Sequence, residues 1–152
     1  MDTVVRTIRV EVIDLLRPWG FFDGSSQEQQ LTCGGGGCLF LSPTHSFHIS
    51  TGLGRGSNNF AELMALKLLL LFVVEKDCHS LQFFGDSMIV IDWARGTSRC
   101  HVLRLLPILE EVALLQQIFD SISFTHVYRE HNGVANRISK EATQFRLAVG
   151  RL

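Results

Sequence analysis

The strongest constraint on the fold is a long apolar stretch at residues 60–74, which is interrupted only by Glu62 and Lys67. A helix needs about 20 apolar residues to cross a lipid bilayer, so this stretch is too short to span one. We therefore expect a buried helix at about 59–75, for which Ser57 or Asn58 is a suitable N-cap. A chain that buries such a helix must provide an apolar layer on which the helix can pack.

The composition is consistent with one folded domain. The chain has 152 residues, of which 46% are hydrophobic, and this content excludes an intrinsically disordered protein. Lysine and arginine total 14 against 15 aspartate and glutamate, which gives a net charge of −1. A strongly basic nucleic-acid clamp is therefore excluded, and any basic binding surface must be local.

The cysteines and the N-terminal segment predict an intracellular protein, nuclear or cytoplasmic. The four cysteines form no CxxC pair, so a structural zinc site is not expected, and reduced thiols are favoured over disulfides: Cys33, Cys38, Cys78 and Cys100. Charged residues interrupt every apolar run near the N-terminus, so the sequence predicts neither a signal peptide nor a transmembrane segment.

The order of elements predicts a mixed α/β fold. The periodicities indicate strands at 20–25, 33–42, 45–54, 80–84 and 122–128, and helices at 4–16, 59–75, 87–94, 105–119 and 134–149. Three consecutive strands with short links imply an antiparallel meander, and the later alternation of strands and helices implies parallel crossovers. We expect a five-stranded mixed sheet flanked by helices at 19–152, with residues 1–18 as an extra N-terminal helical extension.

Three carboxylates lie in unusually apolar surroundings. Asp23 follows two phenylalanines, Glu62 lies in the apolar helix, and Asp86 follows an apolar strand. A carboxylate in such a setting is costly unless it is paired or binds a cation, and Mg²⁺ prefers carboxylates with water and phosphate oxygens. Two metal ions would suit phosphodiester hydrolysis. The structural alternatives are a turn aspartate at Asp23 and a helix N-cap at Asp86.

Four segments that surround these residues resemble the motifs of type 1 ribonucleases H. The last of them is similar to the form found in plant retroelement-derived ribonuclease H domains. The segments occur in the expected order and cover roughly residues 19–148: Phe21-Phe22-Asp23-Gly24-Ser25-Ser26, Gly56-Ser57-Asn58-Asn59-Phe60-Ala61-Glu62-Leu63, Gly85-Asp86-Ser87 and Arg129-Glu130-His131-Asn132-Gly133-Val134-Ala135-Asn136.

The resemblance implies an Mg²⁺-dependent endonuclease, with Mn²⁺ as an alternative ion, that cleaves the RNA strand of RNA–DNA hybrids. It implies that the three carboxylates hold the metals and that Asn58 and Asn59 contact the hybrid in its minor groove, where shape and the 2′-OH are recognised. It also implies that four further residues lie beside the substrate: Gly24, Ser25, Ser57 and Asn132. The sequence leaves a protein partner or a homodimer open.

Asn136 departs from the family pattern. The resemblance implies a fourth catalytic and metal-binding carboxylate at this position, but asparagine offers only a neutral oxygen. Three explanations stay open: a natural, degenerate relative with weak or no nuclease activity, an active enzyme that uses the asparagine carbonyl as a ligand, or a deliberate Asp→Asn change. The function is therefore an active ribonuclease H or, alternatively, a binding module.

The resemblance also suggests roles for a few basic residues. His131 lies near the place where some relatives have a mobile histidine that assists proton transfer or product release, and a plain surface histidine is the alternative. Arg95, Arg99 and Arg104 are either a hybrid-binding edge or part of a solvated loop.

Overall fold

A mixed five-stranded sheet forms the centre of the structure, a computed structural model that describes residues 13–27 and 32–133. The strand order is β3-β2-β1-β4-β5. Strands β1 to β3 pair antiparallel, whereas β4 pairs in parallel with both β1 and β5, as the sequence predicts. The bounds are β1 (Trp19–Gln27), β2 (Thr32–Ser42), β3 (His45–Arg55), β4 (Ser80–Gly85) and β5 (Ser121–His126).

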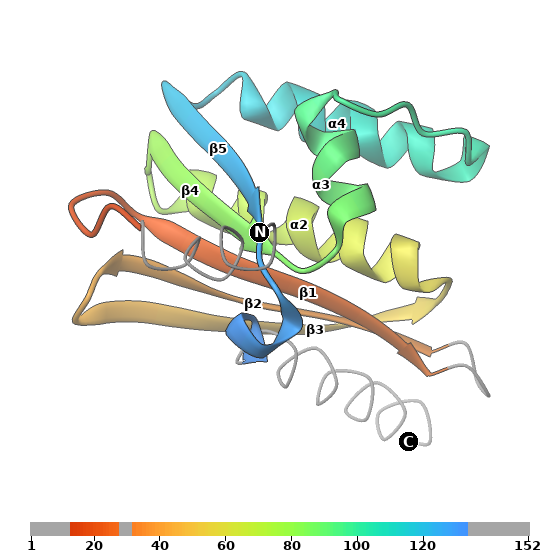
Figure 1. Cartoon of the computed structure of the whole chain (residues 1–152), viewed down its shortest axis with the longest axis horizontal. Coiled ribbons are helices and arrows are strands. Elements are labelled where there is room, and N and C mark those ends of the chain that lie inside the picture. The colour runs from red at the N-terminus through yellow and green to blue at the C-terminus, as the bar shows by residue number, and fades with distance from the viewer. Residues whose placement is uncertain (1–12, 28–31, 134–152) are drawn as a thin grey trace, which may run out of the picture.

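Three helices gather on one face of this sheet, as Figure 1 shows: α2 (Asn58–Glu75), α3 (Met88–Arg95) and α4 (Leu106–Gln116). The main hydrophobic core lies between these helices and the sheet and includes Phe22, Leu66 and Phe83, all fully buried. Trp19 and Phe84 belong to a second, smaller cluster. Because successive side chains of a strand point to opposite faces, β1 contributes Phe22 to the first cluster and Trp19 to the second.

The register of the parallel pair determines where the candidate site forms. Phe22 of β1 is paired with Gly85, the last residue of β4. The next residues along the two strands are Asp23 and Asp86, so the two carboxylates lie near the same end of the paired strands. Asp23 is itself paired with Gly36 of β2 and lies inside β1, so the alternative in which it is a turn aspartate is wrong.

Serine side chains cap the two helices that flank the site. The hydroxyl of Ser57 accepts a hydrogen bond from the Phe60 main-chain N–H, 3.2 Å away, as predicted for the start of α2. The Ser87 hydroxyl accepts from the Val90 N–H at 3.4 Å and caps α3, so the alternative of a capping Asp86 is wrong. Gly96 caps the C-terminus of α3, and its φ of 76° lies in the left-handed region that favours glycine.

Differences from the predicted elements are confined to their ends. The helix expected at 105–119 is α4, which is shorter and follows a 3-10 helix, η2 (Leu103–Leu105). The strand expected to reach residue 128 ends at His126, where its pairing with β4 ends, and the loop that follows contains a second 3-10 helix, η3 (Arg129–His131).

Several predictions lie outside the described residues. These are the helix at 134–149, Asn136, and the helix at 4–16 up to residue 12. Residues 13–16 are not helical, and Leu15 and Leu16 form a turn. All four cysteines are free thiols. Among the helices of the described part of the chain, none combines the length and apolar character needed to cross a membrane.

Candidate metal centre

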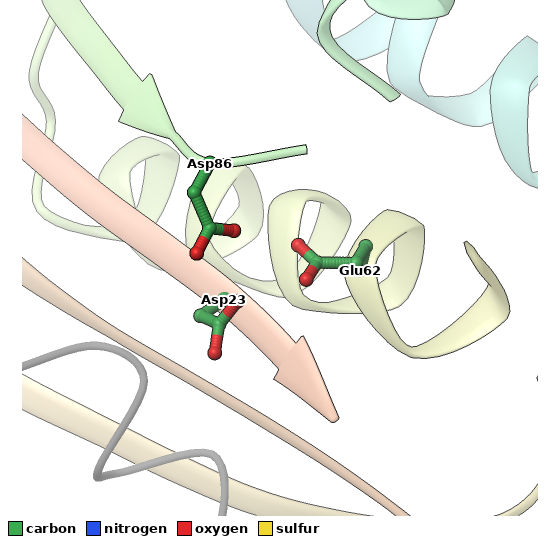
Figure 2. A group of neighbouring side chains, drawn as sticks. All are labelled: Asp23, Glu62 and Asp86. Carbon is green, nitrogen blue, oxygen red and sulfur yellow. The ribbon is translucent and has the colours of Figure 1, made fainter. Parts of the chain in front are cut away.

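Three carboxylates from three separate elements converge at one end of the sheet. Asp23 comes from β1, Glu62 from the first half of α2, and Asp86 directly follows β4. One oxygen of each side chain lies within 4.8 Å of an oxygen of the other two. Figure 2 shows the Glu62 and Asp86 side chains reaching toward the part of β1 that carries Asp23. The structure thus brings together the three acids that the sequence singles out.

Gly24 allows Glu62 to come this close to β1. A Cβ atom at Gly24 would overlap the Ala61 carbonyl and the main-chain nitrogen of Glu62, so α2 rests directly on the strand backbone here. The Gly24 backbone also donates a hydrogen bond to the Glu62 carboxylate. The resemblance implied a substrate contact at Gly24, and the structure gives this glycine a positioning role beside Glu62.

The cluster is buried. The exposed fraction is 1% for Asp23 and 7% for Glu62, and 6% for the Asp86 side chain. Oε2 of Glu62 is buried without a hydrogen-bond partner among the described residues. Burial, followed by the charge of Asp23 and a hydrogen bond with it, raises the pKa of Glu62 to about 11. Without a cation the site therefore holds Glu62 in its neutral form at neutral pH.

The pKa of Asp86 is raised less than that of Glu62. Burial and the nearby Asp23 raise its pKa to about 6, while the positive charge of Arg129 opposes this shift. Nε of Arg129 lies 3.4 Å from Oδ2 of Asp86. A divalent cation would relieve the repulsion between these acids and satisfy the free oxygen of Glu62. The residues present therefore fit a divalent metal ion such as Mg²⁺ or Mn²⁺.

Glu62 and Asp86 line a pocket of about 390 Å³. Polar groups line it beside the carboxylates: Gly24, Ser25, Ser26, Asn58, Asn59, Ser87 and Arg129. Oδ1 of Asn58 accepts a hydrogen bond from the Ser26 N–H at 3.0 Å, which ties the start of α2 to the end of β1. Four of the predicted substrate-binding residues therefore line the pocket, namely Gly24, Ser25, Asn58 and Asn59, whereas Ser57 serves as the helix cap.

Asn132 has a structural role apart from the three acids. Asn132 is 1% exposed, and its amide donates a hydrogen bond to the Phe22 carbonyl at 2.9 Å, so it joins η3 to β1. Only the backbone of His131, in η3, belongs to the described structure. Asn132 does not line the pocket, and neither do three exposed arginines: Arg95 at the end of α3, Arg99 in the loop that follows, and Arg104 in η2.

Arg129 is the charged site residue that sequence reasoning missed. Arg129 is the first residue of the fourth motif, and this position was the signal that could have identified it. The local sequence does not show, however, that β5 ends opposite Gly85. That register carries Arg129 to the rim of the acidic cluster.

Comparisons with known proteins agree with this architecture. RNase H1 from the halophilic archaeon Halobacterium salinarum has a TM-score of 0.79 and 26% identity, over 84% of this chain and 98% of that chain. The N-terminal RNase H domain of a Mycobacterium tuberculosis protein, solved as a fusion with maltose-binding protein, has a TM-score of 0.81 and 21% identity, over 88% and 98%.

A third solved structure contains nucleic acid. LC11-RNase H1, isolated from compost by a metagenomic approach and solved in complex with an RNA/DNA hybrid, has a TM-score of 0.74 and 20% identity, over 86% of this chain and 99% of that chain. Among curated proteins, none matches this sequence. The family model described as reverse transcriptase-like matches residues 21–142, which is most of the chain. The chain therefore belongs to the reverse transcriptase-like family and has the ribonuclease H-like fold.

Proposed function

We propose that this protein is a metal-dependent endonuclease that cleaves the RNA strand of RNA–DNA hybrids. The observation that carries the proposal is the convergence of Asp23, Glu62 and Asp86, with oxygens within 4.8 Å of one another, beside a pocket that Glu62 and Asp86 line together with polar groups. Three buried acids at this range cost free energy unless a cation is bound, because they must either repel one another or stay protonated, so the cluster is better suited to binding a metal than to stabilising the protein.

Asp23, Glu62 and Asp86 would hold the metal, and Mg²⁺ suits them because it prefers carboxylate oxygens together with waters and phosphate oxygens. When bound, divalent ions activate water and neutralise charge on the phosphate. The protein contributes the fixed positions of the carboxylates: β1 and β4 hold the two aspartates through strand pairing, and Gly24 sets the approach of Glu62.

The hybrid is the proposed substrate because the pocket offers neutral hydrogen-bonding groups beside the acids. Asn58 and Asn59 lie at the start of α2, on the rim of the pocket. Amide side chains of this kind suit a minor groove, where base edges carry little sequence information and the 2′-OH distinguishes RNA from DNA. LC11-RNase H1, which has this fold, was solved with an RNA/DNA hybrid, and this supports the choice.

Cleavage of a hybrid labelled on its RNA strand tests the proposal. We expect the unaltered chain to shorten the RNA strand in Mg²⁺ or Mn²⁺, to leave single-stranded RNA and duplex DNA intact, and to lose activity in EDTA. Asp23→Asn removes a metal ligand and is expected to lower the rate by at least about a hundredfold, whereas Glu110→Gln, on the exposed side of α4, is the matched control. No cleavage at high enzyme concentration in either metal would contradict the proposal.

A second candidate function is that of a binding module without nuclease activity. The observation that favours it is Asn136, which stands where the resemblance implies a fourth carboxylate. One negative charge fewer is expected to weaken binding of a second metal ion. On this alternative the domain binds hybrids or a protein partner through the same pocket but does not cleave.

The substitution Asn136→Asp separates the two candidates. If the binding module is correct, the unaltered chain binds hybrid without cleaving it, and Asn136→Asp restores metal-dependent cleavage. If the unaltered chain already cleaves as fast as Asn136→Asp, the binding module is excluded. Hybrid affinity of both proteins, measured by fluorescence anisotropy, shows whether a difference in rate reflects binding or chemistry.

A further inference from the structure

Arg129 is the one cationic side chain among the described residues that line the acidic pocket. Its Nε lies 3.4 Å from Oδ2 of Asp86, which is longer than the roughly 2.7–2.9 Å of a strong charge-assisted hydrogen bond. The described structure gives Arg129 no other ion pair or side-chain hydrogen bond. Asp86 therefore holds the guanidinium loosely and leaves most of its donors available to a ligand.

The main chain around Arg129 is firmly held, whereas its side chain is not. The Val127 N–H donates to the Gly85 carbonyl at 2.9 Å, and the Asn132 N–H donates to the Arg129 carbonyl at 2.9 Å. The Asn132 amide in turn bonds to the Phe22 carbonyl. The residues that flank η3 are thus tied to the end of β4 and to β1, while the Arg129 side chain is 73% exposed. A fixed base and a free, charged tip are what a ligand-contacting arginine requires.

A metal ion at the acids would weaken the present contact of Arg129. The cation would take up the negative charge of Asp86 and repel the guanidinium, whose attraction to that carboxylate is its only ion pair in the described structure. The available partner at the rim is then the phosphate backbone of a bound nucleic acid. Arginine is well suited to phosphate, because its planar fork of N–H donors can bind two oxygens at once.

We propose that Arg129 binds a backbone phosphate of the hybrid beside the metal centre, and that its pairing with Asp86 belongs to the substrate-free state. The proposal rests on the proposed function, because it assumes that nucleic acid enters this pocket. It assigns to Arg129 a substrate contact that positions the strand, and it assigns no proton transfer to the arginine.

Hybrid binding at several salt concentrations tests the proposal. All proteins carry Asp23→Asn, which keeps the RNA strand intact, and Kd is measured by fluorescence anisotropy. We expect Arg129→Gln to weaken binding roughly tenfold and to reduce the slope of log K against log salt by about one, as the loss of one phosphate contact requires. Arg129→Lys keeps the charge and should keep the slope while it loses part of the affinity.

Lys76→Gln is the matched control. Lys76 is an exposed cation at the opposite end of α2 from Glu62, so its removal changes the net charge equally without touching the pocket. We expect its slope of log K against log salt to equal that of the parent, which is the protein that carries Asp23→Asn alone. An equal decrease in Lys76→Gln and Arg129→Gln would show a general charge effect and overturn the proposal. Thermal unfolding of each variant verifies that the fold is retained.

Hybrids with a single neutral methylphosphonate linkage locate the contact. The parent protein should lose affinity when the contacted phosphate is neutral, and Arg129→Gln should show no further loss at that linkage, because the interaction is already absent. If the loss of affinity from the neutral linkage and the loss from Arg129→Gln add up at every linkage, Arg129 contacts none of these phosphates and its proposed role is overturned. The proposal that the protein binds hybrids would remain. Failure of the parent and of the unaltered chain to bind any hybrid would instead overturn the proposed function as well.

Discussion

The side-chain amide of Asn132 donates a hydrogen bond to the main-chain carbonyl of Phe22, 2.9 Å away, across 110 positions of the chain. Phe22 immediately precedes Asp23, and Asn132 closes the 3-10 helix that carries Arg129. This bond therefore joins the acid-bearing strand β1 to the segment that places a cation at the pocket rim. The geometry of the site depends on this link as well as on the acids themselves.

Replacing Asn132 by alanine should destabilise the protein. The substitution leaves the buried Phe22 carbonyl without this donor, and such a loss costs about 1–3 kcal/mol. The free energy of unfolding from urea denaturation measures the effect. Gln117→Ala, at an exposed amide at the end of α4, is the control and should stay within about 0.5 kcal/mol of the unaltered chain. Equal effects of the two substitutions would show that the bond to Phe22 contributes nothing.

Gly24→Ala should damage both the fold and the site. Its methyl group would overlap the backbone of Ala61 and Glu62, so α2 must move away from β1 and carry Glu62 with it. We expect a loss of about 3 kcal/mol, at the upper end for overpacking, because backbone rather than a flexible side chain must yield. Gly133→Ala has open space for its methyl group and is the matched control. Urea denaturation measures the loss of fold stability, and the Tm increase on adding Mg²⁺ measures the damage to the site. An unchanged Tm increase with Mg²⁺ in Gly24→Ala would contradict the positioning role of Gly24.

The sequence predicts the sheet and the three acids because their signals are local. Alternating apolar residues mark the strands, and a lone glutamate in the apolar run at 60–74 marks Glu62 as unusual. The element order then limits the sheet topology, which brings Asp23 and Asp86 to neighbouring strand ends.

Contacts between distant polar side chains could not be predicted in this way. The pair Asn132–Phe22 depends on where β5 ends relative to β4, and the contact of Arg129 with Asp86 depends on the same register. Gln82 is another example. Its buried side chain accepts a hydrogen bond from the Asp14 N–H at 2.9 Å and donates one to the Asp14 carbonyl at 2.8 Å. No periodicity in the local sequence specifies these partners, since they follow from the assembled sheet.

The metal-free protein should become less stable as the pH rises. In the fold, the pKa of Glu62 is raised from 4.5 to about 11 and that of Asp86 from 3.8 to about 6. At a pH between the usual pKa and the raised pKa of each group, the folded state therefore binds more protons than the unfolded state. The contribution of these two groups to stability decreases as the pH rises through this range. We expect the Tm in EDTA to fall between about pH 5 and pH 8.

Two variants show whether this pH dependence comes from the cluster. Asp23→Asn removes a charge that raises both pKa values, so it should raise the Tm at pH 8 and flatten the decrease. Glu110→Gln, which removes an exposed carboxylate on α4, should leave the decrease as it is. Mg²⁺ should stabilise the unaltered chain more at pH 8 than at pH 5, because protons compete with the metal for the carboxylates. Identical pH profiles for all three proteins would contradict the explanation.

The central claim is that Asp23, Glu62 and Asp86 bind one metal site together. Anomalous diffraction from crystals soaked in Mn²⁺ measures this most directly, because manganese scatters anomalously and its position needs no assumption about activity. We expect an anomalous peak between the three carboxylates, within about 2–2.5 Å of oxygens from at least two of them, and no such peak in Asp23→Asn crystals. Well-ordered carboxylates with no peak between them at saturating Mn²⁺ would contradict it.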